Sequence, residues 1–333
     1  MSASGGYGTV EQPDSSLLFD DDIREIELDY SRAEASSFCS NYIRTSKYTW
    51  YSFLPLTLME QFRRAANAYF LFVSILMAIG EYTTLFDTPS TPWSTLLTLT
   101  SVVFVSMVRS GLEDNKRGEA DKQINNKLSR RLLRSDESGN ILAFPNYENP
   151  SEGIRPSIVE EISGRVIMEE VRWKNIRVGD ILYLRSGDQI PADVILVSSS
   201  EIEGNAYVET SNIDGEINLK LKNSVATKEN SVGSVWNKPL DLCNAKFNLF
   251  CEKPHTDITS FQGVMTHNGR DISVDSSSFL LRGSTIRNVK WALGVVVYTG
   301  VETKSAMNSR DIPFKVSSLE SRMNQIIKYI IVV

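Results

Sequence analysis

The most informative stretch of this chain is Glu209-Thr-Ser-Asn-Ile-Asp-Gly-Glu-Ile-Asn-Leu-Lys220. Its centre, Asp214-Gly-Glu216, suits the tip of a loop, because a glycine lets the backbone turn sharply and approach another surface closely. Glu216 then presents a carboxylate that can orient or deprotonate a water molecule. A plain β-turn is the alternative interpretation, since Asp-Gly is the commonest turn signal of a hairpin. The rest of the chain has to distinguish the two.

Composition limits the classes of function. The 333 residues, 41% of them hydrophobic, suffice for one sizeable core and two structural units, and a formal net charge of −6 argues against nucleic acid as the main partner. Cys39, Cys243 and Cys251 are odd in number and lack C-x-x-C spacing, so they are interpreted as reduced thiols of a cytosolic part. Only two histidines accompany them, and no zinc or copper site is expected.

The beginning of the chain is polar and acidic. Residues 1–40 contain too little apolar surface to offset the cost of ordering, which predicts a disordered, solvated tail. Acids alternate with Ile and Leu over residues 19–29, and this leaves a docking or autoinhibitory segment as the alternative. Residues 41–64 carry basic and aromatic side chains and predict a cytosolic segment that precedes a membrane.

Two uncharged runs predict a transmembrane helical hairpin. Residues 65–86 and 93–111 each approach the roughly 20 residues that a bilayer span needs, and residues 87–92 form a polar loop between them. A buried helix of a soluble protein is the alternative for either run alone. Two such runs so close together favour the hairpin.

Basic residues predict the orientation of this hairpin. Arg63 and Arg64 precede the first run, and Arg109, Lys116 and Arg117 follow the second, whereas the loop contains neither Lys nor Arg. By the positive-inside rule both ends of the hairpin lie in the cytosol and the loop lies on the other side.

The chain continues with a charged helix predicted over residues 112–134. Its last arginines, Arg130, Arg131 and Arg134, either contact anionic lipid headgroups or face solvent. The residues that follow, 135–164, are rich in Gly, Pro, Asn and Ser and predict a loop or insertion.

Short β-type runs separated by Gly, Pro and Asp begin at Val166. Many short strands at close spacing predict a compact all-β sandwich or distorted jelly roll, with a long polar excursion over about residues 223–278. Ser317-x-x-Glu320 is a capping box that predicts a final helix. The apolar run after it is too short to cross a bilayer, so residues 311–333 are interpreted as a helix entering a truncated third span of a fragment.

This order of parts resembles the N-terminal third of a P-type ATPase, in the class IV phospholipid flippase branch. The stretch from Glu209 to Lys220 is similar to the flippase signature E-T-S-N-L-D-G-E-T-N-L-K, and Asp214 stands where ion pumps carry Thr. Other matching stretches follow in the same order: Phe53-Leu-Pro, Glu60-Gln-Phe-Arg-Arg, Gln189-Ile-Pro-Ala-Asp193, Cys251-Glu-Lys-Pro254, Leu280-Leu-Arg-Gly283 and Val297-Tyr-Thr-Gly300.

The resemblance implies an α+β membrane protein, with a transmembrane helical hairpin, a cytosolic all-β actuator domain over residues 112–310 and flanking helices. It implies an ATP-driven phospholipid translocase whose actuator domain dephosphorylates an aspartyl phosphate encoded downstream. Glu216 would position the attacking water and take its proton, and Gly215 would let the loop close. Asp214 would hold either the loop shape or a neighbouring side chain.

The resemblance also implies ATP and Mg²⁺ as cofactors of the full-length parent, with none bound by this fragment. Its implied partners are a phospholipid substrate, the bilayer and a two-span accessory β-subunit, but no nucleic acid. The implied location is the plasma membrane or a secretory or endosomal membrane.

The sequence departs from the family at three places, one of which is the stretch 135–164, because it is longer than the family's usual hairpin there. Ile217 replaces the usual Thr after the glutamate, and Met77 and Ala78 stand on the implied substrate path, where flippases commonly carry a Gln-Gln pair. These residues keep a catalytically inactive regulatory membrane module as one alternative. A cation-transporting P-type ATPase is the other, although the Asp214-Gly-Glu216 form argues against it.

Overall fold

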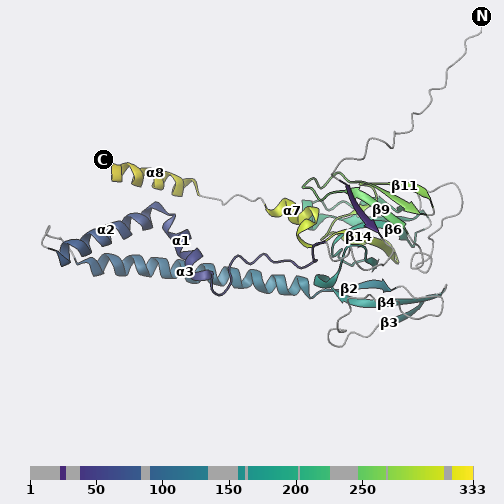
Figure 1. The fold of residues 1–333 in the computed structure, drawn as a ribbon, viewed down its shortest axis with the longest axis horizontal. Coiled ribbons are helices and arrows are strands. Elements are labelled where there is room, and N and C mark those ends of the chain that lie inside the picture. The colour runs from purple at the N-terminus through teal and green to yellow at the C-terminus, as the bar shows by residue number, and fades with distance from the viewer. Residues whose placement is uncertain are drawn as a thin grey trace, which may run out of the picture. The chain divides into compact units, whose positions relative to one another are not determined.

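The computed structural model of the chain describes residues 23–27, 38–83, 91–133, 157–161, 164–201, 203–225, 247–267, 269–310 and 317–332. These residues form two compact units, coloured along the chain in Figure 1. The sheet unit comprises the described parts of Met1–Tyr42 and Lys127–Arg310. The helical unit comprises the described parts of Ile43–Asn126 and Asp311–Val333.

The sheet unit is built from antiparallel strands. Among the described residues, seven strands form a sheet in the order β12-β6-β14-β5-β2-β4-β3, and two smaller sheets have the orders β1-β9-β10-β11 and β13-β7-β8. The strands are β1 (Ile23–Glu27), β2 (Leu128–Leu133), β3 (Ser157–Glu161), β4 (Gly164–Arg172), β5 (Ile181–Leu184), β6 (Asp193–Ser199), β7 (Asn205–Glu209), β8 (Lys220–Asn223), β9 (Phe247–Glu252), β10 (Gln262–His267), β11 (Arg270–Asp275), β12 (Phe279–Leu280), β13 (Thr285–Arg287) and β14 (Ala292–Tyr298). Short helical elements accompany them: η2 (Trp173–Asn175), α4 (Ser211–Asp214), η3 (Gly300–Glu302) and α7 (Lys304–Arg310).

The core of the sheet unit explains its strand-rich sequence. Strands β6 and β14 are buried along their whole length in the seven-stranded sheet, and apart from Asp193, Ser198 and Ser199 of β6 their residues are apolar, whereas β9 alternates buried and half-buried residues. The rings of Phe261 and Phe279 stack at 4.4 Å within the core. At Gly294 a Cβ atom would lie 2.2 Å from Val194 Cγ1, so only glycine lets β14 approach β6 there. The predicted all-β body is confirmed.

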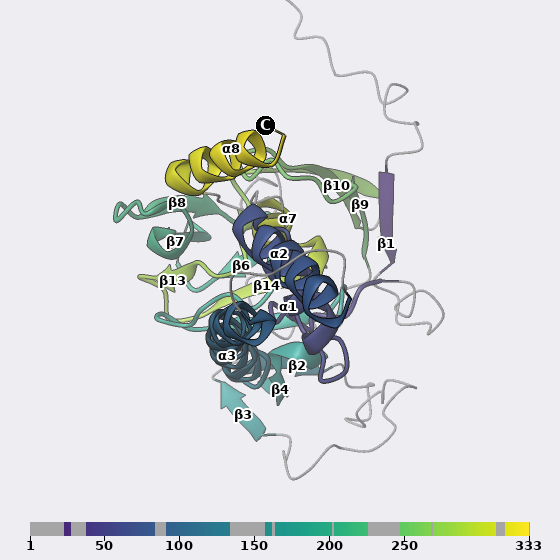
Figure 2. The same ribbon diagram turned by 90° about the vertical axis from the view of Figure 1, so that its left-hand side faces the viewer.

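The N-terminal tail differs from the prediction at β1. This strand pairs with β9 and lies at the edge of the four-stranded sheet (Figure 2). Ile26 is only 2% exposed in the core, and Arg24 binds Glu302 at 2.7 Å. The prediction of a solvated tail is wrong for these residues, because backbone pairing and one buried side chain offset the cost of ordering. Residues 1–22 and 28–37 lie outside the described residues.

The helix predicted up to residue 134 ends earlier, at Asn125, and its continuation is β2. Arg131 lies on this strand with a buried side chain that pairs with Asp180 at 3.1 Å and Glu169 at 2.8 Å. A contact of Arg131 with lipid headgroups is therefore excluded, because its guanidinium is enclosed by two carboxylates of the sheet unit. Arg134 lies outside the described residues.

Two segments predicted as irregular contain strands. Within the predicted insertion, 135–164, residues 157–161 form β3 and pair with β4, and most of the remainder lies outside the described residues. Within the excursion predicted over 223–278, residues 226–246 are outside the described part, whereas residues 247–275 carry β9, β10 and β11. In β9 and β11, more and less buried residues alternate along most of the strand, so polar residues lie between the apolar ones and weaken the strand pattern in the sequence.

The helical unit contains α1 (Phe53–Phe62), α2 (Ala65–Tyr82), α3 (Pro92–Asn125) and α8 (Ser318–Val332). Helices α2 and α3, with 18 and 34 residues, are long and apolar enough to cross a membrane. Large side chains such as Phe72 and Phe104 are exposed, whereas the hydroxyls of Ser74 and Thr95 meet between the two helices at 3.2 Å. Apolar residues outside and small polar residues inside are the arrangement expected of helices in lipid. Residues 84–90, which include most of the predicted loop, lie outside the described residues.

Helix α8 starts where the capping box predicts. Ser317 precedes it, and its Oγ accepts a hydrogen bond from the backbone N–H of Leu319 at 3.2 Å. Within the helical unit α8 contacts α2, where Asn324 Oδ1 accepts the N–H of Ala65 at 3.3 Å.

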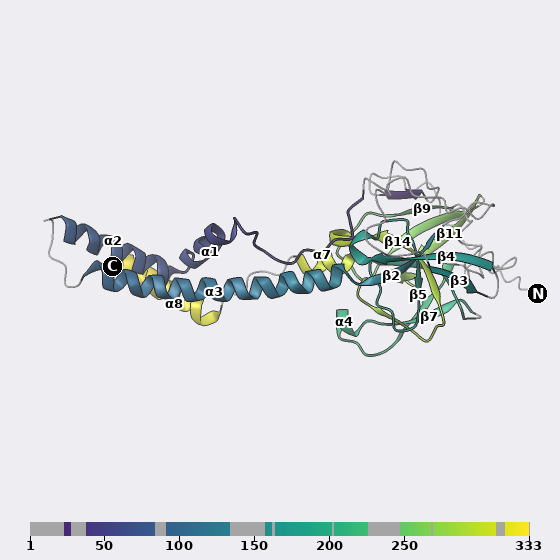
Figure 3. The ribbon, with the colours of Figure 1, turned by 90° about the horizontal axis from the view of Figure 1, so that it is seen from below.

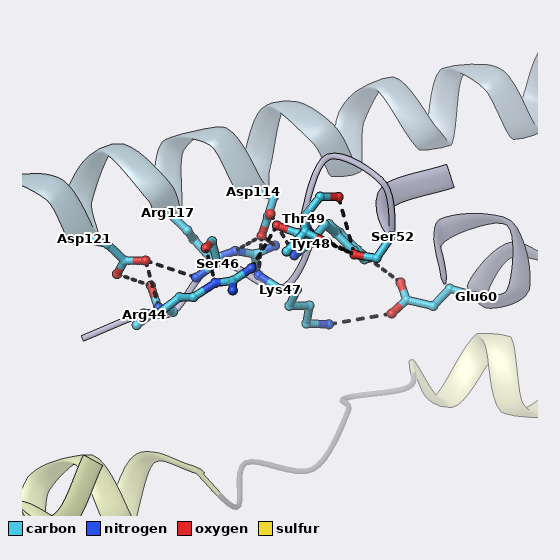
Figure 4. A network of polar contacts seen from close by, with 11 residues as sticks. Arg44, Ser46, Lys47, Tyr48, Thr49, Ser52, Glu60, Asp114, Arg117 and Asp121 are labelled. Carbon is cyan, nitrogen blue, oxygen red and sulfur yellow. Dashed lines mark hydrogen bonds and ion pairs between the residues drawn. The ribbon is translucent and has the colours of Figure 1, made fainter. Parts of the chain in front are cut away.

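An extended segment, residues 43–48, is bound along α3 through side chains of the helix (Figure 4). Asp114 and Asp121 are seven residues apart and so lie on one face of α3. Each carboxylate accepts two backbone N–H groups of the segment. The pairs are Asp121 with Thr45 (2.8 Å) and Ser46 (3.1 Å), and Asp114 with Lys47 (2.8 Å) and Tyr48 (3.1 Å).

Replacing Asp114 by Asn is expected to loosen this segment. Both carboxylate oxygens accept a backbone N–H, so the amide must turn its own N–H₂ group toward one of them. Hydrogen bonds to charged groups contribute about 1.5–3 kcal/mol, so hydrogen exchange at Lys47 or Tyr48 should accelerate about tenfold or more. Exchange followed by mass spectrometry measures it. Glu113→Gln, which alters an exposed pair with Arg109 on the same helix, is the control, and equal exchange in both variants would contradict the expectation.

Candidate functional site

The Asp214-Gly-Glu216 loop connects β7 to β8 in the three-stranded sheet. Strand β7 lies between β13 and β8, with Glu209 opposite Thr285 and Val208 opposite Lys220. The single turn of α4 follows β7 and stands at the margin of the strands (Figure 3). Pairing on both sides thus fixes the base of a short loop, and the tip extends beyond the sheet.

Gly215 ends α4 in a left-handed conformation, with φ at +78°. Its N–H donates to the carbonyl of Ser211 at 3.2 Å, which closes the turn. No heavy atom lies within 4 Å of the position that a Cβ would occupy. The glycine is therefore needed for the backbone conformation and not for space within this chain.

Asp214 is the hydrogen-bonding centre of the loop. Its carboxylate accepts the hydroxyl of Thr210 at 2.9 and 3.0 Å, the backbone N–H of Glu216 at 2.9 Å and the Nζ of Lys220 at 2.6 Å. The sequence left two roles open for Asp214, namely holding the loop shape and holding a neighbouring side chain. The geometry supports both, because the same carboxylate organises the turn and fixes Lys220.

The pKa of Asp214 is lowered from its ordinary 3.8 to about 2, first by the hydrogen bond from Lys220 and then by the N–H of Glu216. A depressed pKa stabilises the folded loop above the ordinary value, and this contribution is lost as the pH falls through about 2. The amide resonance of Glu216 should therefore titrate with a midpoint near pH 2 in an NMR experiment. A midpoint near 4 would show that the carboxylate is not held in this way.

Glu216 stands at the tip with its side chain 60% exposed. Its carboxylate pairs with Lys220 Nζ at 3.0 Å, and the next residue, Ile217, is 82% exposed. Residue 217 takes part in none of the hydrogen bonds around Asp214. The absence of a threonine hydroxyl at this position therefore breaks none of them. An accessible carboxylate at a glycine turn can reach a water molecule on another surface, which is what a general base requires.

Sequence reasoning missed two residues of this site, Thr210 and Lys220. Thr210 precedes α4 and reaches Asp214 through its hydroxyl, and Lys220 bridges both carboxylates. The signal for Lys220 was present, since a cation follows Glu216 by four residues. At the base of the loop Glu209 pairs with Arg287 at 2.8 Å, and this contact joins β7 to β13.

Met77 and Ala78 lie in the helical unit on α2, and both are half-buried. The sulfur of Met77 lies 3.7 Å from Thr95 Oγ1 of α3, so this side chain lies at the α2–α3 contact. The loop and these two residues therefore belong to different units of the chain.

Within the part of the chain that the structure describes, no three His, Cys, Asp or Glu side chains are grouped so that they would hold a metal ion. Asp214 and Glu216 are instead bridged by Lys220. In the part of the chain that the structure describes, these two carboxylates are thus not arranged as a Mg²⁺ site.

Two family models match the chain. The model of the phospholipid-translocating ATPase N-terminal region matches residues 25–90, which include the last part of β1, the segment bound along α3, α1 and α2. The model of the P-type ATPase actuator domain matches residues 154–290, which include the Asp214-Gly-Glu216 loop. The two matches fall on different parts of the chain and together cover more than half of it.

Several curated proteins are similar over most of the chain. It is 37% identical over 299 residues to the probable phospholipid-transporting ATPase 12 of Arabidopsis thaliana, which is 90% of this chain and 22% of that protein. It is 35% identical over 293 residues to the phospholipid-transporting ATPase FetA of Mus musculus (87% and 21%) and 33% identical over 303 residues to the phospholipid-transporting ATPase DRS2 of Saccharomyces cerevisiae (91% and 20%). The chain thus spans about a fifth of the length of these relatives.

Proposed function

The chain belongs to the phospholipid-translocating branch of the P-type ATPases, and on this premise we propose that it is the N-terminal part of an ATP-driven phospholipid transporter. The sheet unit is its actuator domain, and α2 and α3 form its membrane hairpin. In this proposal the actuator domain brings Glu216 to an aspartyl phosphate that another part of the complete protein carries. The supporting observation is the exposed carboxylate at a glycine turn, held between the paired strands β7 and β8.

The proposed step is hydrolysis of an acyl phosphate. A water oxygen forms a bond to phosphorus while the bond between phosphorus and the aspartyl oxygen breaks. The aspartate leaves as a carboxylate, inorganic phosphate is released, and the proton of the water passes to the carboxylate of Glu216. Placement of water and charge does most of the work in such in-line displacements. Gly215 and Asp214 contribute by setting the turn that presents Glu216.

The family uses ATP and Mg²⁺, and their binding is proposed for the parts of the complete protein outside the described residues. The proposed substrate is a phospholipid, taken from the outer to the cytosolic leaflet, and a two-span accessory subunit is the proposed partner. Arg63, Arg64 and Arg109 support an orientation with the sheet unit in the cytosol. The proposed location is the plasma membrane or a secretory or endosomal membrane.

Reconstitution of the complete protein tests this function. ATP hydrolysis in vesicles should rise when one phospholipid headgroup class is included, and labelled lipid of that class should move to the leaflet exposed to ATP. Stimulation by a cation and by no phospholipid would favour a cation-transporting ATPase. Absence of any phosphoenzyme would favour a catalytically inactive membrane module.

A further inference from the structure

We infer that Lys220 is a positioning residue that lets the acidic tip of the loop close on a phosphorylated aspartate, an inference that rests on the proposed function. The feature behind it is a single cation that bridges two carboxylates. The tripeptide Asp214-Gly-Glu216 itself contains no positive charge.

Lys220 is fixed at its backbone and reaches the tip with its side chain. It is the first residue of β8 and lies opposite Val208 of β7 in the ladder. Its Nζ lies 2.6 Å from Asp214 Oδ2 and 3.0 Å from Glu216 Oε2. Lys220 therefore links the exposed Glu216 carboxylate to the sheet and holds it in place.

The charges of the tip explain why a cation is needed. Asp214 and Glu216 carry two negative charges, and the phosphoryl group that they approach is itself an anion. Lys220 reduces the net charge of the tip from −2 to −1. Glu209 and Arg287 at the base already neutralise each other at 2.8 Å and supply no further cation. Without Lys220, repulsion would oppose the encounter that the reaction requires.

The protonation of the contacts agrees with this role. The hydrogen bond from Lys220 is the first cause of the lowered pKa of Asp214, and the bond to Asp214 is the first cause of the raised pKa of Lys220. Both groups are thus charged throughout the neutral range. Lys220 itself does not touch the reacting atoms in this account, because it acts through the position and the electrostatic field of Glu216.

The experiment measures decay of the phosphoenzyme in the complete transporter, after labelling with ATP and a chase with unlabelled ATP. Lys220→Gln is expected to slow decay about tenfold to a hundredfold, the range that misplacement of a reacting group produces. Formation of the phosphoenzyme should be unchanged, which also shows that the variant folds. Lys220→Arg keeps the charge and should restore decay to within a few-fold.

Salt provides a readout that a purely structural role would not give. Raising tetramethylammonium chloride from about 0.05 to about 0.5 M shortens the screening length from about 14 Å to about 4 Å. Decay in Lys220→Gln should then recover in part, because the repulsion that limits it is screened. Lys222→Gln is the matched control, since Lys222 Nζ binds the carbonyl of Ser276 at 2.7 Å, away from the loop carboxylates, and its decay should be unchanged.

The outcomes separate the inference from the function on which it rests. If Lys220→Gln decays at the normal rate while Glu216→Gln is stalled, the inference is wrong and the proposed function stands. If Lys220→Gln is slow but neither Arg nor salt improves it, the residue is structural and the inference is also wrong. Normal decay in Glu216→Gln would remove the proposed function of the loop, and with it this role of Lys220.

Discussion

In the complete transporter, Glu216→Gln is expected to accumulate phosphoenzyme, with decay slowed about 10²–10⁴-fold. The amide has nearly the shape of the carboxylate, but it cannot take a proton from the attacking water. The loop around it should remain intact, because the contacts that Thr210, Lys220 and the backbone N–H of residue 216 make with Asp214 do not involve the Glu216 side chain. The side-chain oxygen of the glutamine can still accept a hydrogen bond from Lys220, as the Glu216 carboxylate does. The substitution therefore removes the base and preserves the turn that presents it.

Phosphoenzyme formation and decay are measured separately by labelling with ATP followed by a chase. Formation should proceed as in the unmodified protein, and only decay and steady-state ATP hydrolysis should fall. Glu201→Gln, at an exposed glutamate of the same unit, is the control for the loss of one acidic charge. Decay at the normal rate in Glu216→Gln, with the control also normal, would mean that another group accepts the proton.

The loop was predictable because its information is local. The dipeptide Asp214-Gly predicts a turn, and Gly215 has the positive φ that such a turn requires. Short β-type runs on both sides, in which apolar and polar residues are mixed, predict the strands β7 and β8 that hold the loop. The two apolar helices were predictable for a similar reason, since length and absence of charge are read from consecutive residues.

The elements that escaped prediction depend on partners far away in the sequence. Strand β1 is an acidic pentapeptide whose order comes from β9, more than two hundred positions later, where Ile26 lies opposite Leu249. Its five residues carry no strand signal strong enough to recognise without that edge. Long-range pairing of this kind overrides local composition.

The side chains of the site show the same limit at a smaller scale. Lys220 is visible in the sequence near two acids, yet only the left-handed turn at Gly215 brings its Nζ to both carboxylates. Thr210 and Asp214 are four residues apart in the sequence, and they become partners only because the single turn of α4 brings both side chains to the same side.

Arg131→Met is expected to destabilise the sheet unit by about 3–5 kcal/mol, because it leaves two carboxylates without their cation. Asp180 and Glu169 lie 3.1 and 2.8 Å from this guanidinium, and the side chains of Arg131 and Asp180 are 7% and 4% exposed. Removing one partner of an ion pair so deeply enclosed costs more than the pair itself contributes. The residue that local pattern placed on a solvent or lipid face should thus be among the most sensitive in the unit.

Equilibrium unfolding of the whole chain in mild detergent, followed by tryptophan fluorescence, measures this loss. Arg130→Met is the matched control. Arg130 precedes Arg131 on β2 and pairs with Asp188 at 3.2 Å, both side chains are about one third exposed, and loss of this pair should cost no more than about 1 kcal/mol. Adding Asp180→Asn and Glu169→Gln to Arg131→Met should recover part of the stability, because the cost arises from unpaired charge. Equal effects of Arg130→Met and Arg131→Met would show that burial of the pair does not determine its contribution.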